Sequence, residues 1–385
     1  MTADVPPRTP NPEPRTSNYE ARIEAERAAM RAHQPRDRAT RLRYNYEELT
    51  SQPAAIRETL TVERDRIRAV ARLLAERASG RIYGIGCGDS WSTCQAVHDT
   101  FEMLLDTPFE VMQALEFTRY GRRFVGASDV VIGLSASGTT AETVRGLQAA
   151  REAGALTIGV TNTEDSLFTQ VPETYLLGRA IRRASFPTQA STVGLAALIA
   201  LACEAARARG LHDERVREAD AWLDALPTTV EQIIAAADPL AAVLGERWVG
   251  RTAFLFVGAG PGLAAAMFGA CKIREGCEGY GWVLGTEEFH HYDIVHPGDP
   301  VFLIAPDDAA YSRAVDVARA VHDAGGVLYS VVPEGETVVA EQSAVSFRIP
   351  PTPAHLVGLP YTLPIQLAAW HIAQAKLQAD RGNGG

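Results

Sequence analysis

The sequence is poor in lysine, in paired cysteines and in long apolar runs, and each shortage argues against a class of protein. Only two of its 37 basic residues are lysines, Lys272 and Lys376. Its 47 acidic residues give a formal net charge of -10, which argues against a broad basic surface for nucleic acid. Its five cysteines form no CxxC pair and are odd in number, which argues against a secreted disulfide scaffold.

No window of the chain approaches 18 uninterrupted apolar residues, as a membrane-spanning helix would require. The longest apolar stretch, residues 193–206, is interrupted by Gly194 and Glu204 and is typical of a buried helix. Residues 1–18 are rich in proline and contain no apolar segment of the kind that begins a secretion signal. We therefore expect a cytoplasmic protein without membrane contact, and a disordered tail over residues 1–18.

What the sequence does contain is an alternation of short apolar strands and helices, which predicts an α/β fold with parallel sheets. Strands are predicted at 81–86, 109–117, 129–134, 156–162, 174–178, 252–260, 300–306 and 327–333. In each half, one strand ends in a glycine turn before a helix, and a later strand leads through a loop into another helix. This repetition favours an internal duplication of one domain, and two unrelated α/β halves are the alternative.

The length of 385 residues is enough for two domains of ordinary size. The expected segments are the tail at 1–18, N-terminal helices at 19–79, a first α/β domain at 80–215, connecting helices at 216–247 and a second α/β domain at 248–379.

A loop rich in hydroxyl groups follows the predicted strand at 129–134 and opens a helix. Ligands of open parallel sheets bind at the carboxyl ends of the strands, and the free N–H groups of a helix N-terminus attract anions. We predict that Ser135, Ser137 and Thr140, with the backbone of Ala136, bind a phosphate group. Simple capping of the helix by the same hydroxyls is the alternative.

Three short segments, SxSGxT at 135–140, CGDS at 87–90 and AST at 190–192, resemble the SIS (sugar isomerase) family of phosphosugar-binding domains. The resemblance covers roughly residues 45–376 and is to double-SIS proteins, namely the isomerase lobe of glucosamine-6-phosphate synthase and the fructosamine-6-phosphate deglycases. It implies two tandem SIS domains of flavodoxin-like, three-layer form.

The same resemblance implies roles for individual residues. The phosphate would be held by Ser135, Ser137 and Thr140, and the sugar would lie against Gly88, Ser90 and Ser191. Asp89 stands where relatives often have a small residue. Its carboxylate would repel a phosphate and would instead bind a hydroxyl or an amine.

The second half carries two further segments that resemble SIS enzymes, at 269–276 and 285–295. By this resemblance Glu275 transfers the proton, His291 opens the sugar ring, and Lys272 is the family lysine one turn before the glutamate. Glu275 and His291 are 16 positions apart, as in the family. Lys272 and Glu275 are expected to be adjacent because positions i and i+3 share a helix face. From the residues alone, a surface salt bridge of Glu275 is the alternative.

The chemistry of sugar isomerisation suits these residue types. Moving a proton between neighbouring carbons needs a base, and burial raises the pKa of a glutamate toward neutrality. A histidine titrates near neutral pH and can protonate a ring oxygen. His290, His291 and His296 form a dense polar cluster with Glu287, Glu288 and Asp293. A metal site is the alternative there, although the spacing matches no standard zinc motif. We therefore expect an enzyme that uses neither a metal nor another cofactor.

Two features separate the chain from the synthase lobe. The sequence ends in AKLQADRGNGG without the family's tail lysine, and no glutaminase domain precedes the lobe. We therefore expect a phosphosugar enzyme that forms a homodimer or a higher homo-oligomer. It is either a deglycase that splits a 1-amino-1-deoxy-ketose phosphate or an aldose–ketose isomerase. A non-catalytic sugar-phosphate sensor and a specialised biosynthetic isomerase or lyase are the alternatives. The expected partners are a sugar-phosphate substrate and a second copy of the chain.

Overall fold

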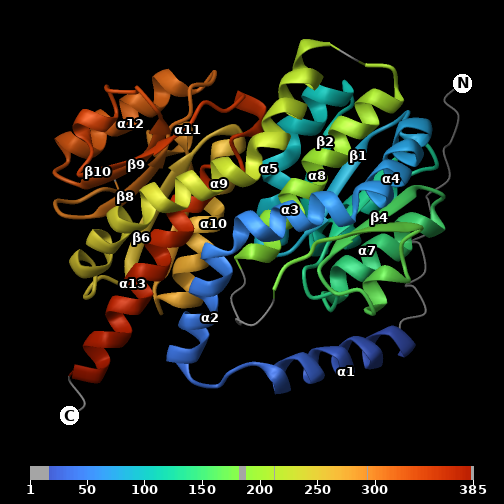
Figure 1. Ribbon diagram of the computed structural model, residues 1–385, viewed down its shortest axis with the longest axis horizontal. Helices are drawn as coiled ribbons and strands as arrows, with labels where there is room; N and C mark the ends of the chain where they lie inside the picture. The colour runs from blue at the N-terminus through green and yellow to red at the C-terminus, as the bar shows by residue number, and fades with distance from the viewer. Residues whose placement is uncertain (1–16, 182–187, 212, 293, 383–385) are drawn as a thin grey trace, which may run out of the picture.

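The computed structural model describes residues 17–181, 188–211, 213–292 and 294–382, and most of the predicted tail lies outside them. Two five-stranded sheets dominate it, and every strand pair in both is parallel (Figure 1). Sheet A has the order β2-β1-β3-β4-β5, and sheet B has the order β10-β9-β8-β6-β7. Numbered within its own half, each sheet has the flavodoxin-like order 2-1-3-4-5. The predicted fold class is confirmed, and the repeated order supports internal duplication.

Sheet A is covered by helices on both faces, which explains why most of its strands are apolar throughout. The strands are β1 (Ile82–Gly86), β2 (Phe109–Gln113), β3 (Val130–Leu134), β4 (Leu156–Thr161) and β5 (Thr174–Leu177). The helices of this half are α5 (Asp89–Leu105), α6 (Ala114–Glu116), α7 (Ala141–Glu152) and α8 (Gln189–Ala208). Alternate strand residues face opposite layers: Ile82 packs in the cluster that includes α5 and α8, and Tyr83 packs in the cluster that includes α7.

Sheet B repeats this arrangement in the second half. Its strands are β6 (Ala253–Gly258), β7 (Tyr280–Gly285), β8 (Pro300–Ile304), β9 (Val327–Pro333) and β10 (Val345–Ile349). Its helices are α10 (Gly260–Gly276), α11 (Thr286–Phe289), α12 (Tyr311–Asp323) and α13 (Thr362–Gly382). The remaining helices are α1 (Ser17–His33), α2 (Arg38–Thr50), α3 (Gln52–Val62), α4 (Arg64–Arg77) and α9 (Glu214–Arg247), which joins the halves.

One continuous hydrophobic core joins the two halves. It contains residues of both sheets, among them Ile82 and Phe256, and buried faces of α5, α8, α9, α10 and α13. Smaller clusters lie on the outer faces, where α7 packs on sheet A and α12 packs on sheet B. The packing of α5 against α10 in the central layer positions the candidate site, because charged side chains of these two helices meet there.

Two strands, β7 and β10, are not predicted by the sequence patterns. The sequence pattern predicts a helix over residues 263–280, whereas α10 ends at Gly276 and Tyr280 begins β7. Both strands lie at the edges of sheet B. An edge strand is only partly covered, so polar and glycine residues interrupt its apolar run.

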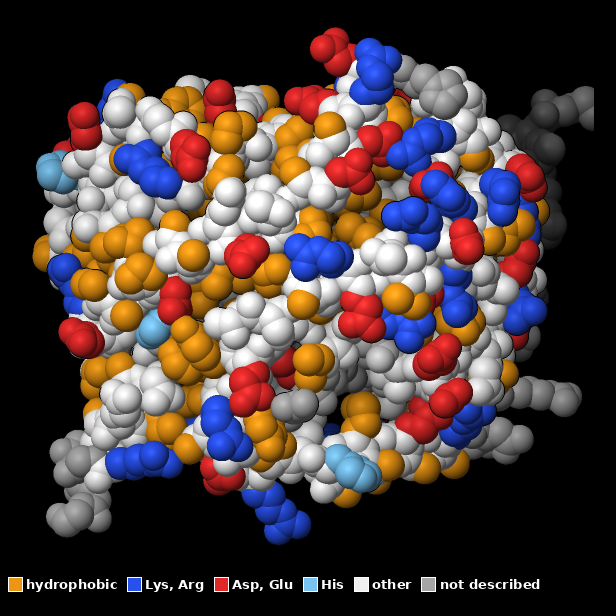
Figure 2. All heavy atoms as spheres, viewed as in Figure 1, with side chains coloured by type: hydrophobic (Ala, Val, Ile, Leu, Met, Phe, Trp, Pro, Cys, Tyr) orange, Lys and Arg blue, Asp and Glu red, His pale blue; other side chains and the backbone are white. Residues whose placement is uncertain are grey.

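Helix α8 is long and apolar enough to cross a membrane by length and composition alone, but 94% of that apolar window is buried inside the protein. It is therefore best described as the core helix that the sequence predicts at residues 193–206. On the face shown in Figure 2, blue and red side chains are interspersed, and no continuous basic surface is visible there.

Candidate functional site

The glycine turn after β1 and the hydroxyl loop after β3 lie at the same edge of sheet A. The two strands pair in parallel, with Ile82 opposite Val130 and Ile85 opposite Gly133, so their carboxyl ends are neighbours. Helix α5 follows β1 into the central layer, and α7 follows β3 on the outer face. The two helices therefore leave the sheet on opposite faces, and the place where they do so is the topological switch point at which open parallel sheets bind their ligands.

The turn after β1 depends on glycine. Gly88 has φ +55°, a left-handed conformation that other residues adopt only with strain. The turn brings the first residues of α5 close to the strand end: the N–H of Ser90 donates to the carbonyl of Cys87 at 3.1 Å. Asp89 and Ser90 thus begin α5 at the switch point, as the sequence predicts.

The hydroxyls of the loop after β3 converge on one another. The Oγ atom of Ser135 lies 2.9 Å from Oγ1 of Thr140 and 3.5 Å from Oγ of Ser137. The backbone N–H of Thr140 donates to Ser135 Oγ at 3.4 Å, and that of Thr139 donates to Ser137 Oγ at 3.2 Å. The carbonyl of Ala136 accepts from the N–H of Asn162 at 3.2 Å and so anchors the loop to the end of β4. Ser135, Ser137 and Thr140 therefore form one group of donors before helix α7.

A cation that sequence reasoning missed reaches this loop from α1. The guanidinium of Arg27 donates to the carbonyl of Thr139 at 3.0 Å. The two residues are 112 positions apart, and no motif around Arg27 identifies it. Its positive charge is partly neutralised by an ion pair with Glu24, whose carboxylate lies 2.6 Å away. Helix α1 thus brings a positive charge to the edge of the predicted phosphate site.

Lys272 joins the two halves of the molecule at the switch point. This side chain is only 3% exposed, and its Nζ lies 2.5 Å from Oδ2 of Asp89 and 2.6 Å from Oε2 of Glu275. Asp89 also accepts a hydrogen bond from Ser191 Oγ at 3.3 Å. Asp89 and Ser191 come from the first half, and the lysine and Glu275 come from α10 of the second. The structure therefore brings four of the predicted residues into one cluster.

The cluster shifts the pKa values of its members. Desolvation by the surrounding protein, with the nearby charge of Asp89, raises the pKa of Glu275 to about 7, although the ammonium of Lys272 opposes the rise. Burial disfavours the charged form of Lys272, but the carboxylates of Asp89 and Glu275 outweigh burial and raise its pKa. At neutral pH Glu275 is therefore close to half ionised, which suits a group that both accepts and returns a proton.

One acceptor of this cluster is left without a donor. Oδ1 of Asp89 is buried and has no hydrogen-bond partner among the described residues, whereas its Oδ2 accepts from Lys272 and Ser191. Buried carboxylate oxygens are normally hydrogen-bonded. This atom is therefore positioned to accept a hydrogen bond from a bound hydroxyl or amine, as the sequence analysis expects of Asp89.

His291 is not brought beside Glu275 within one chain. It follows α11, its side chain is 63% exposed, and its Nε2 lies 4.0 Å from the carboxylate of Glu287. No hydrogen bond or ion pair joins its imidazole to Glu275 or to Asp89 in the described part of the chain. The role predicted for His291 stays a prediction.

The sequence predicts no metal at the cluster of histidines and carboxylates around His291. Across residues 17–382, leaving out the positions that the structure does not describe, no three His, Cys, Asp or Glu side chains gather closely enough to hold a metal ion. Asp293, which the sequence analysis counts in this cluster, lies outside the described residues.

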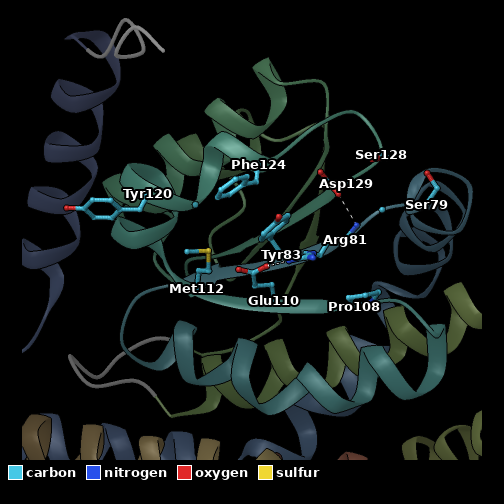
Figure 3. Close-up of a pocket in the computed structure, with 12 residues that line it drawn as sticks. Ser79, Arg81, Tyr83, Pro108, Glu110, Met112, Tyr120, Phe124, Ser128 and Asp129 are labelled. Carbon is cyan, nitrogen blue, oxygen red and sulfur yellow. Dashed lines mark hydrogen bonds and ion pairs between the residues drawn. The ribbon is translucent and has the colours of Figure 1, made fainter. Parts of the chain in front are cut away.

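A cavity of about 960 Å³ lies at the opposite edge of sheet A (Figure 3). Most of its lining residues precede or begin the strands, among them Arg81 before the first strand, Tyr83 in it and Asp129 before the third. Tyr120 and Phe124 line it from the segment that follows the second strand. Arg81 forms an ion pair with Glu110 at 2.7 Å. The cavity is therefore separate from the candidate site, which lies at the carboxyl ends of the same strands.

Comparison with protein families supports the resemblance seen in the sequence. A family model described as "SIS domain" matches residues 77–200, which include the glycine turn, the hydroxyl loop and Ser191. Two relatives named "Glutamine--fructose-6-phosphate aminotransferase [isomerizing]", from Escherichia coli (strain K12) and Salmonella typhimurium, are each 28% identical over 346 residues. The match covers 86% of this chain and 56% of each relative, so the chain spans about half the length of these curated relatives.

Solved structures share the fold of the whole double domain. The C-terminal domain of glucosamine-fructose-6-phosphate aminotransferase from Francisella tularensis matches with a TM-score of 0.76 at 20% identity, covering 86% of this chain and 96% of that one. Tagatose-6-phosphate ketose/aldose isomerase from Escherichia coli matches with a TM-score of 0.71 at 14% identity, covering 90% and 95%. At these identities the likeness concerns the fold alone.

Proposed function

The chain belongs to the SIS-domain family, and from that premise we propose that it is a cytoplasmic, metal-independent enzyme that moves a proton on a phosphosugar. The names of its relatives support the substrate class, since they act on fructose 6-phosphate or tagatose 6-phosphate. The sugar phosphate is held by Ser135, Ser137 and Thr140, with the sugar against Gly88, Ser90 and Ser191.

The observation that carries the proposal is the contact between the halves. Lys272 of α10 pairs with Asp89 at the switch point of the first half, and Glu275 of the same helix pairs with Lys272. A phosphate bound at the loop therefore leaves its carbon skeleton close to a carboxylate whose pKa is about 7. Such a base accepts and returns a proton near neutral pH, which a surface salt bridge would not require.

The deglycase reaction is the finer form of the proposal. Glu275 removes a proton from C1 of a 1-amino-1-deoxy-ketose phosphate, and the electron pair of the C–H bond forms a double bond between C1 and C2. The π bond of the C2 carbonyl breaks, and its oxygen takes a proton from water, which gives an enaminol. Return of the proton from Glu275 to C2 gives a protonated imine at C1, which water then hydrolyses to an aldose phosphate and a free amine. The unpaired Oδ1 of Asp89 supports this form, because it can accept a hydrogen bond from the cationic amine. Without the amine, the same proton transfer interconverts a ketose and an aldose phosphate.

The proposal includes a homodimer in which His291 serves the partner's site. The side chains of Tyr280, Trp282 and Tyr292 are 77%, 56% and 55% exposed close to His291 in the sequence. Large exposed aromatic side chains are typical of surfaces that bind another protein. A partner that covers this surface would bring His291 near the sugar, where its imidazole would act on the ring oxygen or the leaving group.

The substitution Glu275→Gln tests the proposal. It should lower kcat by about 10²- to 10⁴-fold on fructosamine 6-phosphates or on fructose 6-phosphate, because the base is lost. Binding should persist, and ligand at 100 times its Kd should still stabilise the variant by about 2.7 kcal/mol in thermal unfolding. The control is Glu278→Gln, an exposed carboxylate that pairs with Arg38 just beyond the end of α10.

Three outcomes separate the alternatives. Turnover on a fructosamine phosphate, with free amine released, establishes the deglycase; turnover on fructose 6-phosphate alone establishes the isomerase. Binding of sugar phosphates by the unaltered protein with no turnover on either substrate would support the sensor and contradict the enzyme.

A further inference from the structure

The hydroxyl loop after β3 is held from behind by the segment that follows β4. The hydroxyl of Thr163 donates to the carbonyl of Ala136 at 3.2 Å. Gly138 has φ +69° and lies directly on this segment, because a Cβ atom added to it would be 2.3 Å from Oγ of Ser166. All these groups are uncharged. They fix the shape of the loop and bring no positive charge to it.

Helix α1 is fastened beside the same segment and against α7. The guanidinium of Arg22 donates to the side chain of Gln170 at 2.8 Å. Glu20, in the first turn of α1, forms an ion pair with Arg145 of α7. Ile23 is only 2% exposed and belongs to the apolar cluster under α7. The helix is therefore a fixed part of the fold next to the hydroxyl loop.

From this helix, Arg27 reaches the loop itself. Its guanidinium donates to the carbonyl of Thr139 at 3.0 Å. The N–H of the same peptide unit, which belongs to Thr140, donates to Oγ of Ser135 at 3.4 Å. The carbonyl and the N–H of a trans peptide point in opposite directions. The guanidinium therefore lies on one side of this peptide, and the converging hydroxyls lie on the other.

The orientation of this peptide decides what a phosphate bound among the hydroxyls would meet. As the peptide stands, its N–H is directed toward them and can donate to a phosphate oxygen. Turned over, it would present its carbonyl oxygen, whose partial negative charge repels an anion. A hydrogen bond from a cation to the carbonyl opposes that turn, and it polarises the peptide so that the N–H becomes a stronger donor.

The charge balance of the loop also calls for a cation. Residues 135–140 carry no charged side chain, whereas a phosphate monoester carries about -1.5 to -2 at neutral pH. The N-terminus of α7 supplies only about +0.5, and Lys272 already pairs with two carboxylates. The ion pair of Arg27 is with Glu24, which is 65% exposed, and such a pair is weak in water. The guanidinium therefore keeps most of its charge for the loop.

We propose that Arg27 is a positioning residue of the phosphate site. It fixes the peptide between Thr139 and Thr140 with its N–H toward the phosphate, and it supplies a positive charge that the loop lacks. This role rests on the proposed function, because it takes residues 135–140 as the place of the phosphate. Helix α1 then determines how tightly the phosphate is held, and it has no part in the proton transfer by Glu275.

Substitution of Arg27 in the full chain tests this role. Arg27→Met should raise the Kd of fructose 6-phosphate and of inorganic phosphate by about tenfold or more in calorimetric titration, because a hydrogen bond from a charged donor is lost. In turnover of a sugar phosphate the loss should appear in KM, with kcat within about twofold. Arg27→Lys, which keeps the charge, should bind more tightly than Arg27→Gln, which keeps only a donor.

The matched control is Arg22→Met on the same helix. Arg22 also fastens α1, but its partners Gln170 and Glu26 lie outside the loop, so the Kd should change little. Equal weakening by Arg22→Met and Arg27→Met would reduce α1 to a structural support and overturn the role of Arg27. An unchanged Kd in Arg27→Met, or a fall in kcat alone, would also overturn it while leaving the proposed function in place.

Failure of the proposed function gives a different result. In that case the unaltered protein binds neither fructose 6-phosphate nor inorganic phosphate, and the role of Arg27 falls with the phosphate site. Thermal unfolding of each variant without ligand, compared with the unaltered protein, shows that a weaker Kd does not come from a loss of the fold.

Discussion

At the scale of single residues, the ionisation of Glu275 decides how the proposed enzyme depends on pH. A glutamate has an ordinary pKa of 4.5, and the environment of this one raises it to about 7. A base must be ionised, so kcat/KM should rise with pH and level off above the pKa. At pH 6 it should be about tenfold below its plateau. In Lys272→Met the ammonium that lowers this pKa is gone, and the rise should move to higher pH.

A pH profile of kcat/KM for the two proteins checks this directly. Glu278→Gln, which alters a carboxylate outside the cluster, should leave the profile in place. A rise centred near pH 4.5 in the unaltered protein would mean that a carboxyl group with an ordinary pKa, and not Glu275, limits the reaction.

The stability of the Lys272–Asp89 pair is a second question at this scale. Both side chains are largely buried, at 3% and 14% exposed. Lys272→Met leaves the Asp89 carboxylate without its counter-charge, and breaking a buried pair in this way destabilises a protein by about 3 to 5 kcal/mol. The double variant Asp89→Leu/Lys272→Met should recover much of that loss, because no charge remains buried. Urea unfolding measures both, and equal losses in the single and double variants would contradict the argument.

Some of these residue contacts follow from the sequence and others do not. The adjacency of Lys272 and Glu275 follows from their spacing of three on a helix, and the structure has it. The contact of Lys272 with Asp89 spans 183 positions and depends on how α5 packs on α10, which no local pattern encodes. Arg27 was missed for the same reason, since its carbonyl partner lies in another element.

At the scale of elements, the turn after β1 determines where α5 begins. A Cβ atom at Gly88 would meet nothing within 4 Å, so Gly88→Ala should lose only the backbone strain of its conformation, φ +55° and ψ -128°, about 1 to 3 kcal/mol. A Cβ atom at Gly86 would lie 2.7 Å from the backbone of Ser90, so Gly86→Ala must displace the first turn of α5. Phosphosugar binding should therefore survive in Gly88→Ala and fail in Gly86→Ala.

Calorimetric titration with fructose 6-phosphate measures binding, and urea unfolding measures stability. Together they separate the backbone strain of Gly88→Ala from the displacement of α5 in Gly86→Ala. Equal loss of binding in the two glycine variants would show that the turn tolerates no side chain at either position and would contradict the distinction.

The strands that are buried along their whole length are all predicted by the sequence. Strands β1, β3, β4 and β8 are buried along their whole length, and each appears in the sequence as an apolar run. Edge strand β7 alternates exposed Tyr280 and Trp282 with buried Gly281, so its pattern depends on what covers the sheet and not on the strand itself. The hydroxyl loop was predictable because it needs only a buried strand, a glycine and a following helix.

At the scale of the whole molecule, α5 and α10 connect two switch points whose charged residues differ. The second follows β6, which lies between β7 and β8 as β1 lies between β2 and β3, and a Cβ atom added to Gly260 of its turn would lie 3.7 Å from Oδ2 of Asp99. Asp89 and Asp99 are ten residues apart on α5, which places the two turns about 15 Å apart along the helix axis. The duplicated fold thus has two equivalent positions whose side chains have diverged, with hydroxyls and Lys272 in one and the carboxylate of Asp99 in the other. This divergence explains why a phosphate group is expected at only one of them.

If His291 of one subunit completes the site of the other, mixed dimers of two inactive variants should recover activity. Glu275→Gln and His291→Asn should each be inactive alone. If a site combines Glu275 of one subunit with the histidine of the other, a mixed dimer of the two variants has one intact site and one doubly altered site. Random reassociation of equal amounts makes half of the dimers mixed, so the mixture should regain about a quarter of the unaltered activity.

Activity after denaturation and joint refolding of the two variants provides the measurement, with each variant refolded alone as its control. Trp282→Glu places a charge on the exposed aromatic surface near His291, which should weaken association of the subunits and lower the recovered activity. If the mixture stays as inactive as its components while it elutes as a dimer, both residues act within one chain, and His291 must then reach Glu275 by a movement of the segment that follows α11.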